Sequence, residues 1–296
     1  MTSKPKWKRR EKMLTKSDVV MPDPQPTDIV VPIMGATGAG KSMFINKLLG
    51  EGTVPVGHRL VSCTEQLKPI IVKPGDHPSL RGLSGRLVIV DTPGFDDTYV
   101  EDAEILRRIS VWLAASYSDS MKLGGVIFLH EISQVRMLGT ALTNTNVFRK
   151  LCGDSNMSSV ILATSKWEIK EWNVCENREA ELKKTFWSGM LDAGARKARF
   201  LNNKDSAWEI LNLIIMRQLR QNILQIQEEL VIKQKIIPDT EAARSLRISL
   251  EQALEMHRKA AADGKTTQEQ IDAICREISQ LKVTFRRRIL AAFGGV

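Results

Sequence analysis

The sequence predicts an α/β protein in which a mainly parallel sheet is followed by an all-helical C-terminal extension. Short apolar runs alternate with helical patterns from Asp28 to about Asn203, and this alternation is typical of a parallel sheet covered by helices. From Asp205 onward the pattern is nearly pure helix. A hydrophobic share of 43% over 296 residues is sufficient for a substantial core.

The chain divides into three predicted parts. Residues 1–27 form a basic, disordered tail that ends in a proline-rich linker, because prolines recur at alternate positions in VVMPDPQPTD (19–28). Residues 28–204 form the α/β domain, and residues 205–296 form a helical or coiled-coil extension.

Strands of the α/β domain are predicted where a short apolar run stands between turn residues. They cover residues 29–34, 67–72, 86–90, 124–130, 158–164 and 198–200. Helices are predicted over 41–49, closed by Gly50, and over 100–117. Pro32 removes an N–H group from what should be a central strand, so a local bulge is expected there.

The extension contains three predicted helices. Ser206 and Glu209 form a capping-box pattern that opens the first, which continues to about Ile237 because Pro238 stops it. The second ends near Gly264. The third opens at the pair Thr267 and Gln270 and carries apolar residues at heptad spacing: Ile271, Ile274, Ile278, Leu281 and Phe285. Two arrangements fit this pattern, a helical hairpin folded on the α/β domain and a dimerising coiled coil.

A phosphate-binding loop is predicted between the first strand and the first helix, where GATGAGKS (35–42) fits the Walker A pattern. Glycines let backbone N–H groups close around phosphates, and the helix N-terminus adds a favourable dipole. Lys41 is expected to reach the β- and γ-phosphates, while the Ser42 hydroxyl ligates Mg²⁺. The predicted nucleotide contacts here are Gly35, Ala36, Thr37, Gly38, Ala39, Gly40, Lys41, Ser42 and Met43.

Two further motifs favour a GTPase over an AAA-type ATPase or a kinase. Asp91 ends an apolar strand, as a Walker B acid does, and DTPG then supplies Gly94, whose N–H is expected to meet the γ-phosphate. After the fifth strand comes SKWE (165–168), which follows the Asn/Thr-Lys-x-Asp order of guanine-reading motifs with Glu168 in place of aspartate. Lys166 and Glu168 are therefore predicted to contact the base.

The order GATGAGKS, SCTEQ, DTPGFDD, SKWE and RFLNNKD resembles the septin-related branch of the TRAFAC-class GTPases. The resemblance is strongest to the immune-associated nucleotide-binding (GIMAP-type) family, with the plastid-import receptor GTPases as cousins, and it covers roughly residues 28–215. It implies a three-layer P-loop G domain with Thr64 as a switch ligand of Mg²⁺ beside Ser42 and Asp91; Thr53 lies too early for this role. It also implies that Asn202 reads the base, with Leu201 replacing the family's phenylalanine.

Phe95 stands where the best-known switch proteins have a glutamine that positions the attacking water. The resemblance implies an apolar residue there, slow hydrolysis by the single subunit and pairing across nucleotide faces, so Phe95 is expected to shield the site or pack against a partner. In the plastid receptors an arginine reaches toward the partner's nucleotide. Glu131 aligns with that arginine, which leaves His130 and Arg136 as candidates for help in trans.

The predicted function is that of a GTP-binding protein, a slow Mg²⁺-dependent GTPase switch that is stimulated by dimerisation across the nucleotide face. Lys41, Thr64 and Gly94 are the expected catalytic residues, and GTP or GDP with Mg²⁺ are the expected ligands. Two alternatives remain: a GTP-dependent assembly scaffold with negligible hydrolysis, and an ATP-binding P-loop protein.

Charge and cysteine usage bear on partners and location. The net charge is +9, with lysines and arginines concentrated in the first sixteen residues and at Arg286, Arg287 and Arg288. This distribution predicts weak attachment to anionic membranes. Nucleic acid is not an expected partner, because aromatic residues do not interleave with the basic ones. Four scattered cysteines, and no apolar run of eighteen residues, favour a cytoplasmic protein without a transmembrane helix.

Overall fold

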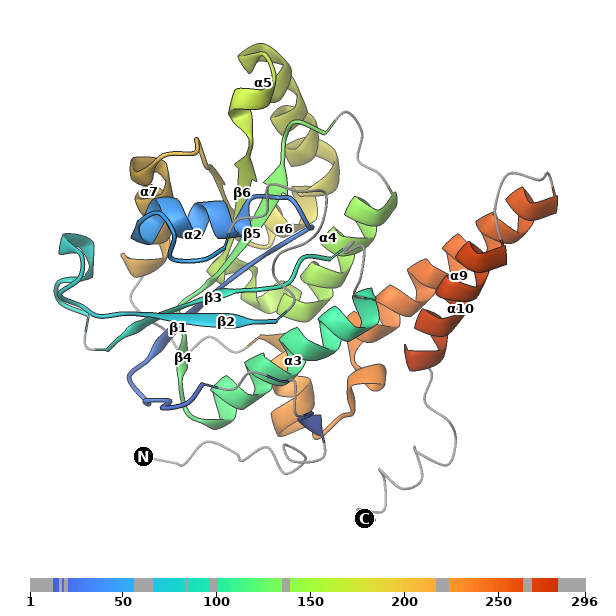
Figure 1. Ribbon diagram of the computed structural model, residues 1–296, viewed down its shortest axis with the longest axis horizontal. Coiled ribbons are helices and arrows are strands. Elements are labelled where there is room, and N and C mark those ends of the chain that lie inside the picture. Colours follow the sequence, from blue (N-terminus) through green and yellow to red (C-terminus); the bar gives the residue numbers. More distant parts are fainter. Residues whose placement is uncertain are drawn as a thin grey trace.

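The computed structural model describes residues 13–15, 18, 21–55, 66–83, 85–95, 101–134, 139–216, 224–262 and 268–281. Its centre is a single sheet with β1 next to β3 and β5 (Figure 1). The strands are β1 (Ile29–Gly35), β2 (Lys68–Val72), β3 (Leu87–Asp91), β4 (Lys122–Leu123), β5 (Val126–Glu131), β6 (Val160–Ser165) and β7 (Arg196–Arg199). Their order is β2-β3-β1-β5-β6-β7, with β4 also beside β1. Only β2 runs antiparallel to its neighbour, so the prediction of a mainly parallel sheet is confirmed.

Helices cover both faces of this sheet and make three layers (Figure 1). The helices of the domain are α2 (Lys41–Leu49), α3 (Asp102–Ser118), α4 (Gly139–Cys152), α5 (Trp172–Glu181), α6 (Ser188–Asp192) and α7 (Lys204–Ile215). Side chains alternate along β1, so Val31 and Ile33 pack with α2 and α7 on one face. Val30 and Met34 pack with α3 and α4 on the other. The two faces of the sheet thus carry two separate apolar clusters.

The predicted strands all form, and helix α2 has the bounds that the sequence predicts. The short strand β4 and the helices α4, α5 and α6 were not predicted from the sequence. Helix α4 begins with GTALTNTN, whose polar residues hide the helical period, although Val147, Phe148 and Leu151 are fully buried.

Pro32 sits in β1, and the expected bulge lies beside it: between the pairs Val30↔Leu123 and Ile33↔Ile127 the neighbouring strand has one residue more than β1. The pairing of Pro32 with Val90 of β3 is regular. The Ile29 N–H bonds Arg86 on the β3 side, so by alternation the missing N–H of Pro32 faces the other neighbour. On that side the strand is interrupted between β4 and β5 by Gly124 and Gly125. The proline therefore lies opposite the extra residue of this bulge, where the strand pairing is already interrupted.

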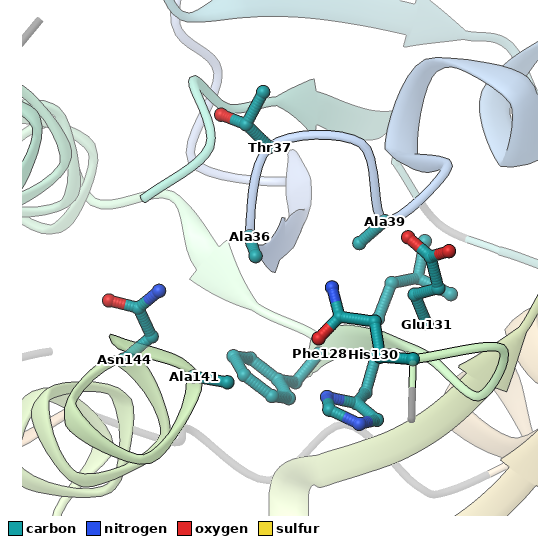
Figure 2. A pocket seen from close by; sticks show the side chains of 10 residues that line it. Ala36, Thr37, Ala39, Phe128, His130, Glu131, Ala141 and Asn144 are labelled. Atoms are coloured by element: carbon teal, nitrogen blue, oxygen red, sulfur yellow. The ribbon is translucent and has the colours of Figure 1, made fainter. Parts of the chain in front are cut away.

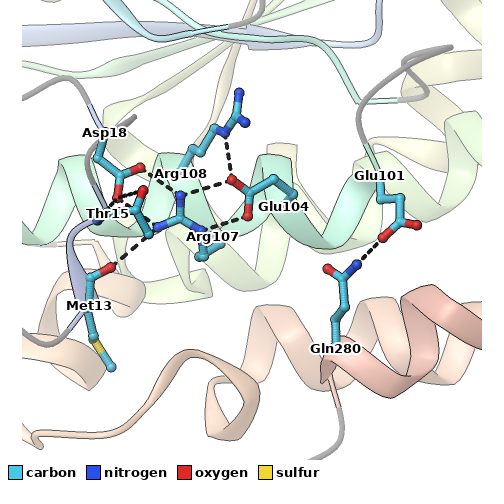
Figure 3. A network of polar contacts seen from close by, with 8 residues as sticks. All are labelled: Met13, Thr15, Asp18, Glu101, Glu104, Arg107, Arg108 and Gln280. Atoms are coloured by element: carbon cyan, nitrogen blue, oxygen red, sulfur yellow. Dashed lines mark hydrogen bonds and ion pairs between the residues drawn. The ribbon is translucent and has the colours of Figure 1, made fainter.

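The expectation of a disordered tail over 1–27 is wrong for the part that the structure describes. Arg107 of α3 binds the Asp18 carboxylate through two nitrogens at 2.7 and 2.8 Å (Figure 3). Its Nη1 also donates to the Met13 carbonyl at 3.4 Å. Met21 is buried in the cluster beneath α3. The described residues of the predicted tail are thus fastened to the folded domain; residues 1–12, 16, 17, 19 and 20 lie outside the described part.

The predicted helix from Ser206 to Ile237 is wrong in both its start and its length. Asn203 is the N-cap, since its side chain accepts a hydrogen bond from the Ser206 N–H, and α7 ends at Ile215. The chain resumes with α8 (Gln225–Gln227) and a π-helical turn, Glu228–Ile232. The physical reason is that Ile214 packs on one face of the sheet while Leu224 packs on the other, so one straight helix cannot bury both.

The last two helices, α9 (Glu241–Ala262) and α10 (Gln268–Leu281), form the predicted helical hairpin and lie side by side (Figure 1). The buried residues Ala242, Ala243 and Leu246 join the start of α9 to the cluster of α3 and α4. From α10, the Gln280 amide donates to Glu101 at the start of α3 (Figure 3). The start of α9 and the end of α10 are therefore packed on the α/β domain, while the other end of the hairpin projects away from the sheet (Figure 1); Phe285 of the heptad pattern lies outside the described residues.

Among the described residues, no helix is both long enough and apolar enough to cross a membrane. The cysteines found there, Cys152, Cys175 and Cys275, are free thiols.

Candidate nucleotide-binding site

The loop of residues 35–40 turns from the carboxyl end of β1 into the N-terminus of α2, as the Walker A pattern predicts. Gly35 has a φ of +144°, and a Cβ there would lie 2.2 Å from the Leu129 carbonyl oxygen, so only glycine fits. Gly38 and Gly40 also have positive φ, +79° and +90°, with open space where a Cβ would stand. The glycines thus set a loop whose backbone is uncovered and able to approach a ligand closely.

Lys41 is the first residue of α2 and is 7% exposed. Its ammonium donates to the carbonyl oxygens of Gly35 at 3.1 Å and of Ala36 at 2.9 Å. These contacts hold the charge inside the curve of the loop. A phosphate placed there would meet both this cation and the positive end of the helix dipole.

Ser42 and Asp91 provide a pair of oxygen donors beside the loop. The Ser42 hydroxyl donates to Asp91 Oδ2 at 2.9 Å, and Asp91 is buried at the end of β3. A hydroxyl and a carboxylate are oxygen ligands of the type that Mg²⁺ takes, so this donor set fits the ion. Thr64, the third expected ligand, lies outside the described residues. Thr53 donates its hydroxyl to the Gly50 carbonyl at 2.7 Å and so stabilises a turn after α2.

The DTPGF segment (91–95) lies directly on the phosphate loop. The Thr37 N–H donates to the Phe95 carbonyl at 2.8 Å, and the Thr37 hydroxyl donates to the Gly94 carbonyl at 3.3 Å. A Cβ at Gly94 would stand 2.4 Å from the Thr37 nitrogen, so this close approach requires glycine. The DTPGF segment is therefore clamped to the loop through Thr37.

The Phe95 side chain is only 1% exposed and belongs to the core cluster of α3. The expectation that Phe95 shields the nucleotide or packs against a partner is wrong, because its ring points into the domain. Phe95 anchors the switch segment in the core, and its backbone reaches the loop.

The SKWE segment meets the other side of the phosphate loop. The Ser165 hydroxyl donates to the Ala39 carbonyl at 2.7 Å, which ties the two segments together. Lys166 has φ of +62° and pairs through Nζ with Glu131 Oε2 at 2.8 Å. Glu131, which the family comparison aligned with a trans-acting arginine, is thus bound to a lysine of its own chain.

Glu168 and Asn202, two of the three predicted base-contacting residues, come together across 34 residues of sequence. Asn202 Nδ2 donates to Glu168 Oε1 at 3.2 Å. The Asn202 Oδ1 is buried and has no hydrogen-bond partner, whereas Glu168 is exposed. A carboxylate with a free face and an unsatisfied amide oxygen are both acceptors, which suits a ligand edge made of N–H donors.

Trp167, between Lys166 and Glu168 in the chain, is a packing residue, and the sequence pattern gave it no role. Its Nε1 donates to Thr164 Oγ1 at 3.1 Å, and its ring lies 4.8 Å from that of Trp172 and 4.3 Å from the Arg199 guanidinium. Around this packed centre, three large apolar side chains are exposed: Ile169, Trp172 and Leu201. They form an apolar rim beside the predicted base readers.

A small pocket lies on the α4 side of the phosphate loop, between Ala36 and the end of β5 (Figure 2). Asn144 of α4 lines it; this side chain is 2% exposed, and neither amide atom has a hydrogen-bond partner. His130 also lines the pocket. Burial lowers the pKa of His130 to about 4, although the Glu131 carboxylate opposes this shift. The imidazole is therefore neutral near pH 7, which disfavours a role as a cation toward phosphate; Arg136 lies outside the described residues.

Three features of this site were not predicted from the sequence. Thr37 binds the DTPGF segment, Glu131 pairs with Lys166, and Asn144 lines the pocket beside the phosphate loop. The contact between Glu131 and Lys166 could have been predicted, since the neighbouring parallel strands β5 and β6 end at the paired residues Glu131 and Ser165. Nothing in the sequence marks Asn144, because the helix that carries it was not predicted.

Residues 30–171 match the family described as 50S ribosome-binding GTPases, a span of slightly less than half of the chain. Solved structures are similar to a larger part. Toc33 from Arabidopsis thaliana with Mg²⁺ and GMPPNP is 16% identical with a TM-score of 0.50, over 66% of this chain and 87% of that one. The structure of the same protein with GDP and Mg²⁺ is also 16% identical with a TM-score of 0.50, over 66% of this chain and 86% of that one.

A further structure concerns the chloroplast translocon components atToc33 and psToc159, for which dimerization is described as important for GTPase activity. It is 14% identical with a TM-score of 0.52, over 67% of this chain and 87% of that one. At such identities the likeness shows the fold, and the predicted P-loop G-domain fold is confirmed. The resemblance to the immune-associated family stays a prediction.

Proposed function

We propose that this chain binds guanine nucleotides with Mg²⁺ and hydrolyses GTP slowly, as a switch whose turnover rises when two copies pair across their nucleotide faces. The observation that carries the proposal is the convergence of three parts on one edge of the sheet. The phosphate loop, the Ser42–Asp91 pair and the SKWE segment meet there, and the Ser165 hydroxyl joins the last part to the first at 2.7 Å.

At the phosphates, Lys41 supplies a charge-assisted contact, and the N–H groups of Gly38 and Gly40 close around the ligand. Ser42 and Asp91, together with Thr64, hold Mg²⁺. When bound, the ion neutralises charge on the β- and γ-phosphates. Gly94 is placed against the loop, where its N–H group reaches the γ-phosphate.

At the base, the Glu168 carboxylate accepts hydrogen bonds from guanine N1 and N2, and Asn202 completes the edge. This arrangement favours guanine over adenine, because adenine offers no N–H donor at N1. The alternative of an ATP-binding protein is therefore weaker than a guanine-specific one.

Slow turnover follows from the burial of Phe95. Positioning and charge stabilisation are nearly all the catalysis that phosphoryl transfer receives. A ring that is 1% exposed and directed into the core supplies neither. Pairing of two copies is supported by the apolar rim of Ile169, Trp172 and Leu201, which is exposed beside the base readers. The same rim also suits the second candidate, a scaffold that assembles on GTP with negligible hydrolysis.

The test is turnover per subunit across a wide dilution series, with light scattering in GTP and in GDP and chromatographic identification of the nucleotide carried by the purified protein. The proposal expects guanine nucleotide, a monomer rate no faster than about 10⁻⁴ s⁻¹, and a rise with protein concentration. GTP-driven pairing without turnover would favour the scaffold instead. ATP binding as tight as GTP binding, or a fast rate that does not depend on concentration, would contradict the proposal.

Attachment to anionic membranes remains a separate prediction, since Arg286 to Arg288 and the first residues lie outside the described part. Sedimentation with anionic and neutral liposomes at low salt tests it, and equal sedimentation with both contradicts it.

A further inference from the structure

We propose that Glu131 is a positioning residue for the base end of the site: its carboxylate aims the Lys166 side chain and so favours binding of the nucleoside part of the ligand. This inference rests on the proposed guanine nucleotide function. Glu131 aligns with the arginine that reaches the partner's nucleotide in the plastid receptors, and the inference gives Glu131 a role within its own subunit instead.

The geometry begins with the sheet. Glu131 and Ser165 are paired partners at the carboxyl ends of the parallel strands β5 and β6. Residue 166 therefore leaves its strand beside the Glu131 side chain. Lys166 Nζ lies 2.8 Å from Glu131 Oε2, and the other carboxylate oxygen, Oε1, accepts a hydrogen bond from the Ser133 hydroxyl. Both oxygens of Glu131 are thus engaged, which fixes the direction of the carboxylate.

The backbone of Lys166 is fixed by its neighbours and not by its own side chain. On one side, Ser165 is hydrogen-bonded to the phosphate loop at Ala39. On the other, Trp167 is buried and bonded to Thr164. Between these two anchors Lys166 adopts the left-handed conformation, which is unusual for a residue with a Cβ.

The side chain of Lys166 would otherwise be free. It has a long flexible stem, and it is 30% exposed, so without a partner it would lose conformational entropy when a ligand orders it. Glu131, whose side chain is 18% exposed, holds the ammonium before the ligand arrives. The pair also cancels a carboxylate charge that would otherwise stand near the phosphate loop and repel an anion.

These two effects act on different parts of the ligand. Loss of the Glu131 charge would free Lys166 and weaken contacts to the base and sugar. The same change would remove a negative charge from the neighbourhood of the phosphates, which would leave binding of a phosphate group alone unharmed or slightly tighter. A purely structural role predicts no such split, because a disturbed site would lose both.

The experiment compares binding of Mg²⁺–GDP and of Mg²⁺–pyrophosphate to the full chain and to Glu131→Gln by calorimetry and competition. We expect GDP to bind about three- to tenfold more weakly, while pyrophosphate changes by less than about twofold. In the background of Lys166→Ala, the Glu131→Gln change should add nothing further to the loss of GDP affinity. Glu51→Gln is the matched control, since it breaks an exposed ion pair with Lys47 of similar length, 2.7 Å against 2.8 Å, elsewhere on the domain.

Equal GDP affinity in Glu131→Gln and in the unaltered chain contradicts the role of Glu131 while leaving the proposed function intact. Parallel loss of GDP and pyrophosphate, or additive effects in the double variant, also contradicts it. An unaltered chain that binds pyrophosphate but no guanine nucleotide contradicts the proposed function, and the inference falls with it.

Discussion

The two ends of the candidate site are built in different ways. At the phosphate end (residues 35–42 with Asp91, Gly94 and Phe95), the contacts are buried and involve the backbone: Lys41 binds two carbonyls, and Thr37 binds Phe95. At the base end (residues 165–168 with Asn202), the side chains of Lys166 and Glu168 contact other side chains, and Glu168 is exposed.

This difference indicates which substitutions should change the stability of the fold and which should change ligand binding. Substitutions at the phosphate end should destabilise the fold, because residues of these segments, such as Phe95 and Ala39, are buried in the core clusters. Changes at the base end alter which ligand is chosen while the fold stays as it is. Substitutions at the two ends should therefore differ in their effects on stability and on ligand affinity.

The largest effect is expected at Phe95. Phe95→Gln should lower the free energy of unfolding by about 3–5 kcal/mol, because it removes a buried aromatic ring and leaves an amide in the core. It should not speed GTP hydrolysis. Urea unfolding and single-turnover assays measure the two outcomes. Phe95→Leu, which keeps an apolar side chain, should cost less and serves as the folded control. A Phe95→Gln protein of unchanged stability that hydrolyses GTP faster would contradict this division, since it would place residue 95 at the nucleotide.

His130, which lines the pocket beside the phosphate loop, should make the free energy of unfolding depend on pH. Its pKa in the folded state is about 4 against about 6.5 in the unfolded state, because burial disfavours the charged imidazole. Between these values the unfolded chain binds more protons, so stability is lost as the pH falls from about 6.5 toward 4, by about 3 kcal/mol from this residue. Denaturation of the unaltered chain and of His130→Phe across this window measures it. Identical pH profiles would contradict the assignment.

Lys41→Ala should weaken GTP binding about 100-fold, because a charge-assisted contact to phosphate is lost. Calorimetry in Mg²⁺ measures the loss, and Lys47→Ala, on an exposed turn of the same helix, is the matched control. GTP affinity equal to that of the unaltered chain would show that the ligand does not bind at this loop.

The smallest effect on total affinity is expected at Glu168. Glu168→Asn should bind GTP about tenfold more weakly and should shift the preference toward xanthosine triphosphate, whose 2-oxo group accepts a hydrogen bond from the new amide. Unfolding should be unchanged. Glu171→Asn, three residues later and also exposed, controls for charge. An unaltered ratio of GTP to xanthosine triphosphate affinity would mean that the SKWE segment is only a connection.

The same division explains what the sequence could predict. The glycine pattern of residues 35–40 reflects local backbone geometry, so the loop and the bounds of α2 were predictable from local rules. The contact between Arg107 and Asp18, 89 residues apart, was not, because its partners meet only after the core has formed. The break after Ile215 was missed for a related reason: helical propensity continues there, but the next buried residue belongs to the opposite face of the sheet.

The placement of Trp167 has a practical consequence for spectroscopy. Its indole is buried between Lys166 and Glu168 in the chain, and it lies next to the exposed ring of Trp172 and beneath the Arg199 guanidinium. Trp208, by contrast, is stacked on His77 at 3.4 Å and donates through Nε1 to the Leu48 carbonyl at 3.0 Å. Ligand arrival at the base end should therefore change the emission of one tryptophan pair, so that nucleotide exchange can be followed by intrinsic fluorescence without a labelled ligand.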